Sequence, residues 1–273
     1  MNSTDVPWYG ATTRRVASHA YPTTVLTVLL IATCIPRTQA TPIHPPARDI
    51  LAGARRHIPA DETWIRGDLR IKASKSRPAG KLQIEIAVTR RADTTTVEYT
   101  VSDVFGQPIE RFVVTRTDSG DVDYRHAQGS EAARNIRRSS TRIQNADVSW
   151  IDMSLDFLWW NDPVWIREDS VKGHACHVLD VPAPELDEAG YSMVRLWLEK
   201  KSHALLRADA FGADGDLARQ FSVRSLKKID GRWMIKSLDF FTYPMRDRTR
   251  LHVREVRAMG VDDAANDAAR DRD

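Results

Sequence analysis

The sequence predicts a mainly β (α+β) protein built on one curved antiparallel sheet. Three observations predict this fold class: apolar and polar residues alternate with a period of two in several short segments, turn signals separate these segments, and no long amphipathic helix interrupts them. Consecutive hairpins form an antiparallel meander, whereas a parallel sheet needs crossover helices. A sheet of this many strands is expected to curl, so that one face becomes concave.

The alternation is clearest at Leu82, Ile84, Ile86 and Val88, which are separated by polar residues or alanine. In a strand, this pattern sends the apolar side chains to one buried face. The same alternation occurs at 97–101, 194–198, 221–223, 233–235 and 251–253. Turns are expected at 78–80, 105–108, 118–120, 213–215 and 229–231, and the Asp-Gly pairs in the last two are strong hairpin signals.

Two segments carry a helical pattern. Residues 47–56 place Ile50, Leu51 and Ala54 on a shared face, and Pro59 follows them. Residues 146–160 form the second segment, and both are candidate lids over the concave face. The polar stretch 125–145 has no apolar period and is expected to form an exposed, mobile loop or a fraying helix.

The front of the sequence resembles an export signal. An apolar run at 21–35 follows Arg14 and Arg15 and precedes Thr38-Gln39-Ala40, a small-residue cleavage site. The expected organisation is a signal peptide at 1–40, a Pro-rich linker at 41–46, a single domain at 47–257 and a disordered tail at 258–273. An uncleaved anchor, or a lipoprotein anchored through Cys34, is the alternative. Cleavage would leave Cys176 as the single thiol, expected as a small buried hydrophobe.

The charge balance argues against nucleic-acid binding. Lys and Arg number 40 against 37 Asp and Glu, and three of the basic residues lie within the first forty positions. The rest of the chain is close to neutral. No basic stripe interleaved with aromatic residues runs through a recognisable nucleic-acid module.

No motif in the sequence predicts a catalytic, metal or cofactor site. In a strand, His174 and Cys176 would point to one face and His177 to the other, which disfavours a shared ion. Carboxylates that could be imagined as a hydrolytic pair are expected to be solvated loop charges; they are Asp152, Asp156, Asp162, Glu168 and Asp169. The Gly-rich phosphate loop, the G-x-S-x-G elbow and H-E-x-x-H are all missing from the sequence.

Four stretches in a fixed order carry a family resemblance. They read NADVSWIDMSL at 145–155, GHACHVLDVP at 173–182, VRLWLEK at 194–200 with ALLRA after it, and a hairpin with Asp-Gly at 221–235. With the export signal and the early helix, this order resembles the outer-membrane lipoprotein-sorting protein family, relatives of the carrier LolA and the receptor LolB. Two departures are the Arg/Ser-rich 134–142 in place of a Gly/Met-rich loop, and 203–206 in place of a Pro-containing turn. The second departure affects where the neighbouring strands end more than it affects the fold.

The resemblance implies an incomplete β-barrel, with short helices covering its open face and an apolar cavity that accepts acyl chains. It implies no catalytic residue and no cofactor. The candidate cavity residues are Ile84, Ile86, Val88, Val97, Tyr99 and Trp197 on the concave face, with Phe157, Trp159 and Trp160 from the lid. The alternative is that these side chains pack against each other as ordinary core.

The leading functional hypothesis is therefore a monomeric periplasmic carrier or chaperone that sequesters acyl chains during outer-membrane lipoprotein sorting. Its expected partners are a lipid or acylated lipoprotein cargo and a membrane-bound donor or acceptor protein. A sensor or interaction module of the same fold is the alternative, and a hydrolase is the third option.

Overall fold

The computed structural model describes residues 44–59, 62–74, 77–136, 141–184, 190–229 and 232–259. The expected signal peptide with Cys34, and the expected tail apart from its first two residues, lie outside these ranges. Within the described part of the chain, no helix has the length and hydropathy needed to cross a membrane.

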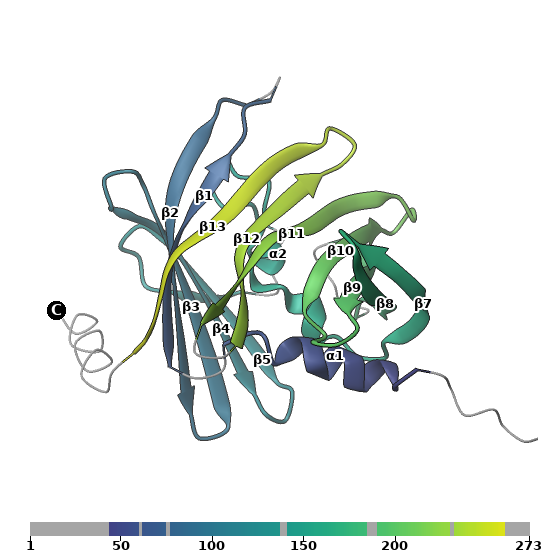
Figure 1. Ribbon diagram of the computed structural model, residues 1–273. Helices are drawn as coiled ribbons and strands as arrows, with labels where there is room; N and C mark the ends of the chain where they lie inside the picture. Colours follow the sequence, from purple (N-terminus) through teal and green to yellow (C-terminus); the bar gives the residue numbers. More distant parts are fainter. Residues whose placement is uncertain are drawn as a thin grey trace, which may run out of the picture. The chain divides into compact units, whose positions relative to one another are not determined.

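Thirteen strands form one sheet in which every neighbouring pair is antiparallel (Figure 1). Their order across the sheet is β6-β5-β4-β3-β2-β1-β13-β12-β11-β10-β9-β8-β7. The strands are β1 (Thr63–Ile71), β2 (Gly80–Arg91), β3 (Thr94–Ser102), β4 (Pro108–Thr117), β5 (Val122–Gln128), β6 (Arg134–Ile136), β7 (Val164–Val171), β8 (His174–Pro182), β9 (Tyr191–Glu199), β10 (Leu205–Gly212), β11 (Leu217–Ile229), β12 (Arg232–Thr242) and β13 (Asp247–Ala258).

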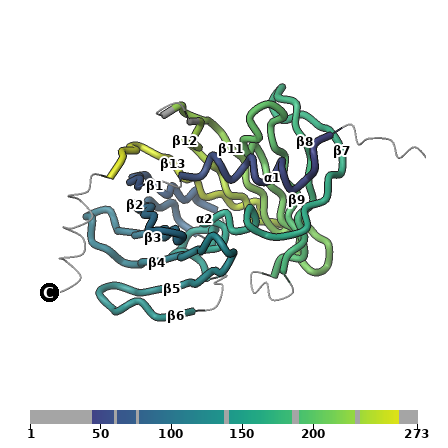
Figure 2. Tube along the Cα trace, turned by 90° about the horizontal axis from the view of Figure 1, so that it is seen from below, coloured from purple at the N-terminus to yellow at the C-terminus, as the bar shows by residue number. Residues whose placement is uncertain are grey.

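The sheet curves but does not close, because β6 and β7 are its two edges and do not pair with each other. In Figure 2 the strands bend around a short helix, α2 (Trp150–Ser154), with β1–β5 on one side of it and β7–β9 on the other. The structure therefore confirms the expected strongly curved, incomplete barrel. The alternation at Ile84 and Val88 produces the expected burial, since both side chains point into the enclosed core.

The connection from β6 to β7 passes from one edge of the sheet to the other, and its described residues 141–163 are called the crossing segment below. It carries α2 and the 3₁₀ helix η1 (Asp156–Trp159). Ser149 begins α2 with a capping box, and Leu155, whose φ is +50°, ends it. The helical region expected over 146–160 is thus confined to two short turns.

The other helix, α1 (Ala47–Arg55), buries Ile50, Leu51 and Ala54, as its sequence pattern predicts. It contacts β7, β9 and η1 and lies across one end of these elements (Figure 1). Together, α1 and the crossing segment cover the concave face of the sheet.

The expectation of a loop or fraying helix at 125–145 is wrong for its first half. Residues 122–128 and 134–136 form β5 and β6, and Tyr124 pairs with Val114 on β4 and with Ile136 on β6. Tyr124 and Ala127 are buried, whereas Asp123, Arg125 and Gln128 are exposed. Pairing with β4 fixes this strand, although its own sequence contains too few apolar residues to show a period.

Candidate functional site

The concave face encloses a cavity of about 610 Å³, called the main cavity below. Its walls come from β1–β5, from β12 and β13, from the crossing segment, and from the end of α1 with the residues after it. The apolar lining consists of Ile58, Pro59, Ile65, Ile86, Val88, Val97, Tyr99, Val122, Met153, Leu155, Trp159, Met234, Ile235, Leu238, Leu251 and Val253.

Strand register brings the floor of the main cavity together. Ile65 on β1 is opposite Ile86 on β2, and Ile86 is opposite Tyr99 on β3. Two residues further along these strands, Val88 is opposite Val97, and this pair points to the same face of the sheet. Residues in one such row share a face of the sheet, so short alternating patterns in three strands become one continuous apolar wall.

Five of the nine candidate residues line the main cavity: Ile86, Val88, Val97, Tyr99 and Trp159. Ile84 and Phe157 are each 1% exposed and belong to the packed core. Trp160, which is 3% exposed, also belongs to this core and borders a surface hollow beside α1.

Trp197 does not lie on the concave face. Its neighbours Leu196 and Leu198 point into the main core, so the strand alternation directs Trp197 to the opposite side of β9. There it packs with Cys176, Val178 and Leu206. The alternation of apolar residues at 194, 196 and 198 in the sequence predicts this direction for Trp197.

Sequence reasoning missed β1 entirely, although Ile65, Leu69 and Ile71 are spaced as in a strand. Gly67 interrupts this pattern, and it lies where β1 has a bulge against β13. An added Cβ at Gly67 would lie 2.8 Å from the backbone oxygen of His252, so the close approach of the two strands requires glycine.

Buried ion pairs hold the crossing segment against the sheet. Arg116 on β4 pairs with Asp156, which also accepts a 2.8 Å hydrogen bond from the Tyr124 hydroxyl. The Arg116 guanidinium lies 4.3 Å from the centre of the Trp159 ring. Asp156 is therefore a buried partner of Arg116 and not the solvated loop charge expected from sequence.

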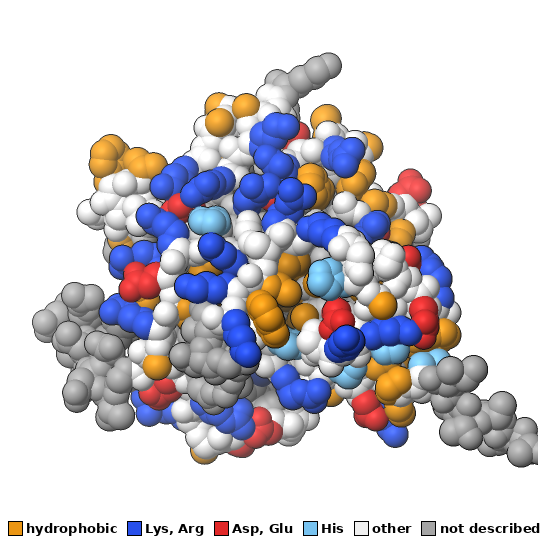
Figure 3. Space-filling model, in the orientation of Figure 1, with side chains coloured by type: hydrophobic (Ala, Val, Ile, Leu, Met, Phe, Trp, Pro, Cys, Tyr) orange, Lys and Arg blue, Asp and Glu red, His pale blue; other side chains and the backbone are white. Residues whose placement is uncertain are grey.

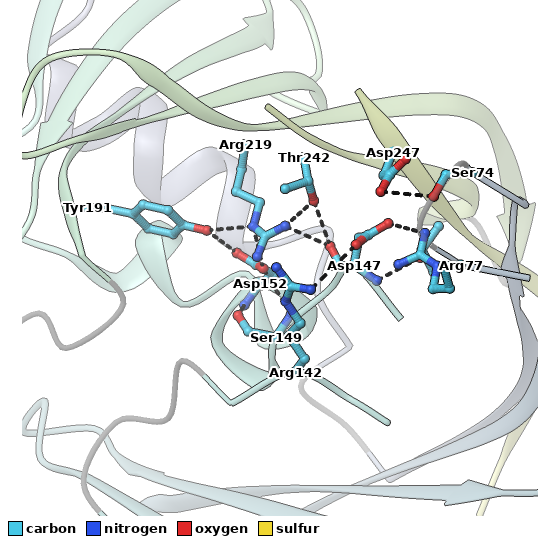
Figure 4. A network of polar contacts seen from close by, with 11 residues as sticks. Ser74, Arg77, Arg142, Asp147, Ser149, Asp152, Tyr191, Arg219, Thr242 and Asp247 are labelled. Carbon is cyan, nitrogen blue, oxygen red and sulfur yellow. Dashed lines mark hydrogen bonds and ion pairs between the residues drawn. The ribbon is translucent and has the colours of Figure 1, made fainter. Parts of the chain in front are cut away.

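A second network holds the start of the crossing segment, as Figure 4 shows. Asp152 accepts a 2.7 Å hydrogen bond from the Tyr191 hydroxyl and pairs with Arg219 at 3.4 Å. Asp147 pairs with Arg77, and its backbone oxygen accepts a 2.9 Å hydrogen bond from Arg219. Asp152 is 1% exposed, so the expectation of a solvated charge is wrong here as well, whereas Asp162, Glu168 and Asp169 are exposed.

Glu110 on β4 supplies a third contact to this segment. One carboxylate oxygen accepts from the Trp150 indole nitrogen at 3.2 Å, and the other accepts from the backbone nitrogen of Gln144 at 3.2 Å. Trp150 is fully buried and stacks on Phe112 with 5.0 Å between ring centres. The crossing segment is thus fixed in place by side chains of β4, β5, β9 and β11.

Tyr99 and Arg116 add polar groups to the wall of the main cavity. Burial raises the pKa of Tyr99 to about 12, with the Asp156 carboxylate adding to the effect and Arg116 opposing it. The hydroxyl consequently stays protonated at neutral pH and can donate a hydrogen bond. Because Tyr99 lies on the wall of the main cavity, a ligand there can accept this hydrogen bond.

One rim of the main cavity is formed by the β2–β3 and β4–β5 turns. Arg90 joins them through a 2.7 Å ion pair with Asp118 and a 3.0 Å hydrogen bond to Thr95. Arg55 and His57 line the wall at the end of α1. Figure 3 shows apolar side chains at the centre of one face of the molecule with Lys and Arg side chains around them.

Cys176 is fully buried in β8, in agreement with its expected role as a small hydrophobe. Burial raises the pKa of its thiol to about 11, so the reactive thiolate is scarce at neutral pH. No cluster of three metal-ligating side chains occurs in the ranges that the structure describes.

Comparison of the structure with solved structures finds the same fold in several proteins. A DUF1329 family protein from Desulfovibrio piger has a TM-score of 0.69 and 18% identity, and the match covers 80% of this chain and 94% of that one. An outer membrane lipoprotein-sorting protein domain, as it is described, from Vibrio parahaemolyticus has a TM-score of 0.68 and 13% identity, with coverage of 81% and 97%. A LolA superfamily protein from Nitrosomonas europaea has a TM-score of 0.62 and 15% identity, with coverage of 80% and 96%.

Sequence comparison gives two results. No curated protein matches the chain significantly. A family model described as an uncharacterized protein matches residues 112–265, which is more than half of the 273 residues. The chain therefore belongs to that uncharacterized family, and it shares its fold with a domain described as outer membrane lipoprotein-sorting and with a LolA superfamily protein.

Proposed function

We propose that the main cavity binds acyl chains and that the protein is a periplasmic carrier or chaperone for a lipid or an acylated lipoprotein. One observation carries this proposal: the fold leaves about 610 Å³ unfilled behind a predominantly apolar wall. Binding sites for small organic molecules typically have roughly 300–1,000 Å³. An ordinary core of this size would be packed by its own side chains.

The energetics of acyl transfer require such a space. Moving one CH₂ group of an acyl chain from an apolar environment into water costs about 0.8 kcal/mol of free energy. A carrier must therefore offer a water-free wall before the chain leaves its membrane. Ile86, Val88, Val97 and Trp159 supply this wall in the proposal.

The polar groups beside this wall suit the point where an acyl chain is linked to its head. The Tyr99 hydroxyl can donate to the carbonyl oxygen of an ester or amide, while Asp156 and Trp159 hold Arg116 beside it. Such a carbonyl is uncharged and accepts a hydrogen bond without displacing the ion pair. The apolar wall would then hold the rest of the chain.

The fold and the front of the sequence support the proposed location. The fold occurs in a domain described as outer membrane lipoprotein-sorting, and the first forty residues have the pattern of an export signal. The proposal assigns no catalytic step to the protein.

Uptake of a fluorescent fatty acid by the purified, delipidated protein tests the proposal. The Val97→Trp variant places a large ring inside the main cavity and should bind at least tenfold more weakly, because Val97 lies on its wall. Val164→Trp is the matched control, because Val164 is 55% exposed on the edge strand β7 and should leave uptake unchanged. Failure of the wild type to bind, or equal binding by Val97→Trp, contradicts the proposal, provided that both variants melt cooperatively.

A charged surface favours the second candidate function, an interaction module. On the outer face, Asp68 is surrounded by Arg70, Lys81 and Arg254, and Asp239 by Arg224, Arg248 and Arg250. Both aspartates are 1% exposed, so the cations dominate this surface. An acidic partner protein would be attracted to it, and its co-purification should then decrease steeply with added salt.

A further inference from the structure

A second cavity of about 470 Å³ lies apart from the main cavity and is called the outer cavity. It lies between the β7–β8 turn, the β9–β10 turn, the middle of β11 and the start of β12. The apolar part of its wall consists of Val171, Ala204, Leu206, Val223, Leu226 and Trp233. Trp233 is 45% exposed, an unusual position for a large aromatic side chain unless something covers it.

Positive charge gathers at the edge of the outer cavity. Lys172, Lys201 and Arg224 line it, and all three residues are exposed. The Lys172 ammonium donates a 2.6 Å hydrogen bond to the backbone oxygen of Val223. Within the described ranges, neither Lys172 nor Lys201 has an ion-pair partner. The outer cavity therefore offers two unpaired ammonium groups above an apolar wall.

The nearby carboxylates neutralise only part of this charge. Among the described residues, Glu199 is the one acidic side chain on the wall of the outer cavity, against Lys172, Lys201 and Arg224, and one of its oxygens accepts hydrogen bonds from the backbone nitrogens of Lys201 and Ser202 and from the Ser202 hydroxyl. Asp239 lies 3.7 Å from Arg224 and is shared with two other arginines. Burial is the main cause that lowers the pKa of Lys172; Arg224 adds to this effect and Asp239 opposes it.

The outer cavity reaches toward the main cavity beneath the β11–β12 hairpin. A space of about 20 Å³ lies between them and shares His57, Ile58 and Ile235 with the main cavity. It shares Ala204 and Trp233 with the outer cavity. Bulges in β11, between Val223 and Leu226, break the regular pairing of the two strands where the outer cavity lies.

We propose that the outer cavity is a second binding site, for an amphiphile with one acyl chain and an anionic carboxylate or phosphate head. The apolar wall would hold the chain, and Lys172, Lys201 and Arg224 would hold the head. An uncharged ligand fits less well, because it would partly desolvate these cations without pairing them. This inference deepens the proposed function and rests on it, since both sites would take acyl chains.

Calorimetric titration of the purified, delipidated protein tests the second site with hexadecanoate, hexadecyl phosphate and hexadecanol. The Lys172→Gln/Lys201→Gln variant should lose about tenfold in affinity for both anions at one of two sites and bind the alcohol unchanged. Lys227→Gln/Lys228→Gln is the matched control, because these lysines are exposed on β11 and do not line the outer cavity. The anion that the wild type binds more tightly at this site carries the preferred head group.

Combination with Val97→Trp separates the two proposals. Two equivalents in the wild type, one lost in Val97→Trp and the other weakened in Lys172→Gln/Lys201→Gln, support both sites. One equivalent that is lost in Val97→Trp and unaffected by Lys172→Gln/Lys201→Gln overturns the outer site and keeps the main cavity. One equivalent that survives in Val97→Trp and is weakened by the lysine changes supports the outer site alone. No binding to the folded wild type overturns both.

Discussion

At the scale of single residues, close packing of Gly53 against His203 fixes α1 on the sheet. A Cβ added at Gly53 would lie 2.0 Å from the Nδ1 atom of His203 and 2.8 Å from its Cβ atom. His203 cannot move aside easily, because it has a φ of +61° in the β9–β10 turn and its backbone nitrogen donates to Glu199. Glycine is needed here for lack of space, in spite of its low helix propensity.

Gly53→Ala is therefore expected to destabilise the protein by about 1–3 kcal/mol, the usual effect of overpacking. In an unobstructed helix, the same change stabilises by roughly 0.5–1 kcal/mol. Urea unfolding measures the difference. His203→Gly should restore the loss, because it removes the ring and suits a positive φ, and a stabilising Gly53→Ala would show that the contact is absent.

Tyr99→Phe tests the polar group within the main cavity. It removes the hydroxyl and leaves the apolar surface, so the affinity for an ester or amide of a fatty acid should decrease about fivefold to tenfold. The affinity for an alkane-like probe without a carbonyl should not change. Equal losses for both probes would show that Tyr99 contributes only to packing.

Sequence reasoning predicted single residues well where a local period determined their direction. Ile86, Val88, Val97 and Tyr99 reach the main cavity because alternation alone places them there. Asp152 and Asp156 could not be assigned in this way, since Arg219 and Arg116, which bury them, are distant in sequence. The rule that acidic residues are usually solvated fails where the fold supplies such a partner.

At the scale of elements, the crossing segment takes the place of barrel closure. Because β6 and β7 remain unpaired with each other, the open side of the sheet must be covered, and the connection between them does this. Its helices are too short to be stable alone, so buried polar contacts with β4, β5, β9 and β11 hold them. The main cavity then remains between this segment and the strands β1–β5, β12 and β13.

Removal of one such contact should be costly. Asp156→Ala leaves the buried Arg116 guanidinium without its carboxylate, and breaking a buried pair costs about 3–5 kcal/mol. Asp123→Ala, an exposed carboxylate on β5, is the control and should change stability by less than about 0.5 kcal/mol.

The double variant Arg116→Met/Asp156→Ala should recover part of the loss, because no unpaired charge remains buried. Chemical denaturation of the wild type, Arg116→Met, Asp156→Ala and the double variant gives the coupling energy of the ion pair. If Asp156→Ala and Asp123→Ala are equally stable, the ion pair does not hold the crossing segment.

Sequence patterns predicted the elements unevenly. Strands with a strict period, such as β2 and β9, and the turn regions between hairpins were identified, whereas β1, β4, β5, β6 and β7 were not. In β1 the bulge at Gly67 interrupts the period, and β5 and β6 obtain their order from pairing with β4. The strand conformation of β5 and β6 therefore depends on pairing with a distant part of the chain and not on their own sequence.

At the scale of the whole molecule, three histidines link stability to pH, and the rings of two of them, His177 and His203, lie 6.2 Å apart. The three are His177 on β8, His203 in the β9–β10 turn and His252 on β13. Burial is the largest cause that lowers the pKa of each, and nearby cations add to it: Lys200 for His177, Arg56 for His203 and Arg70 for His252. Carboxylates oppose the shift less strongly at each site.

Because these histidines bind protons more weakly when folded, the unfolded chain takes up protons first as the pH falls. The stabilisation is complete above the ordinary histidine pKa of about 6.5 and is lost progressively below it. Carboxylates with lowered pKa, such as Glu199, act in the same direction only below about pH 4.5. The free energy of unfolding should therefore decrease between pH 7 and pH 5 mainly through the histidines.

Urea unfolding across pH 5–8 measures this dependence for the wild type and for the triple variant His177→Gln/His203→Asn/His252→Gln. Asn is chosen at position 203 because it tolerates the positive φ better than other polar residues. At pH 7.5 the triple variant should be less stable than the wild type, because the substitutions remove the packing of the three rings. Its free energy of unfolding should, however, change less between pH 7 and pH 5. A wild-type curve that is flat over this range, or an equal slope in both proteins, would mean that burial of these rings does not control the response to acid.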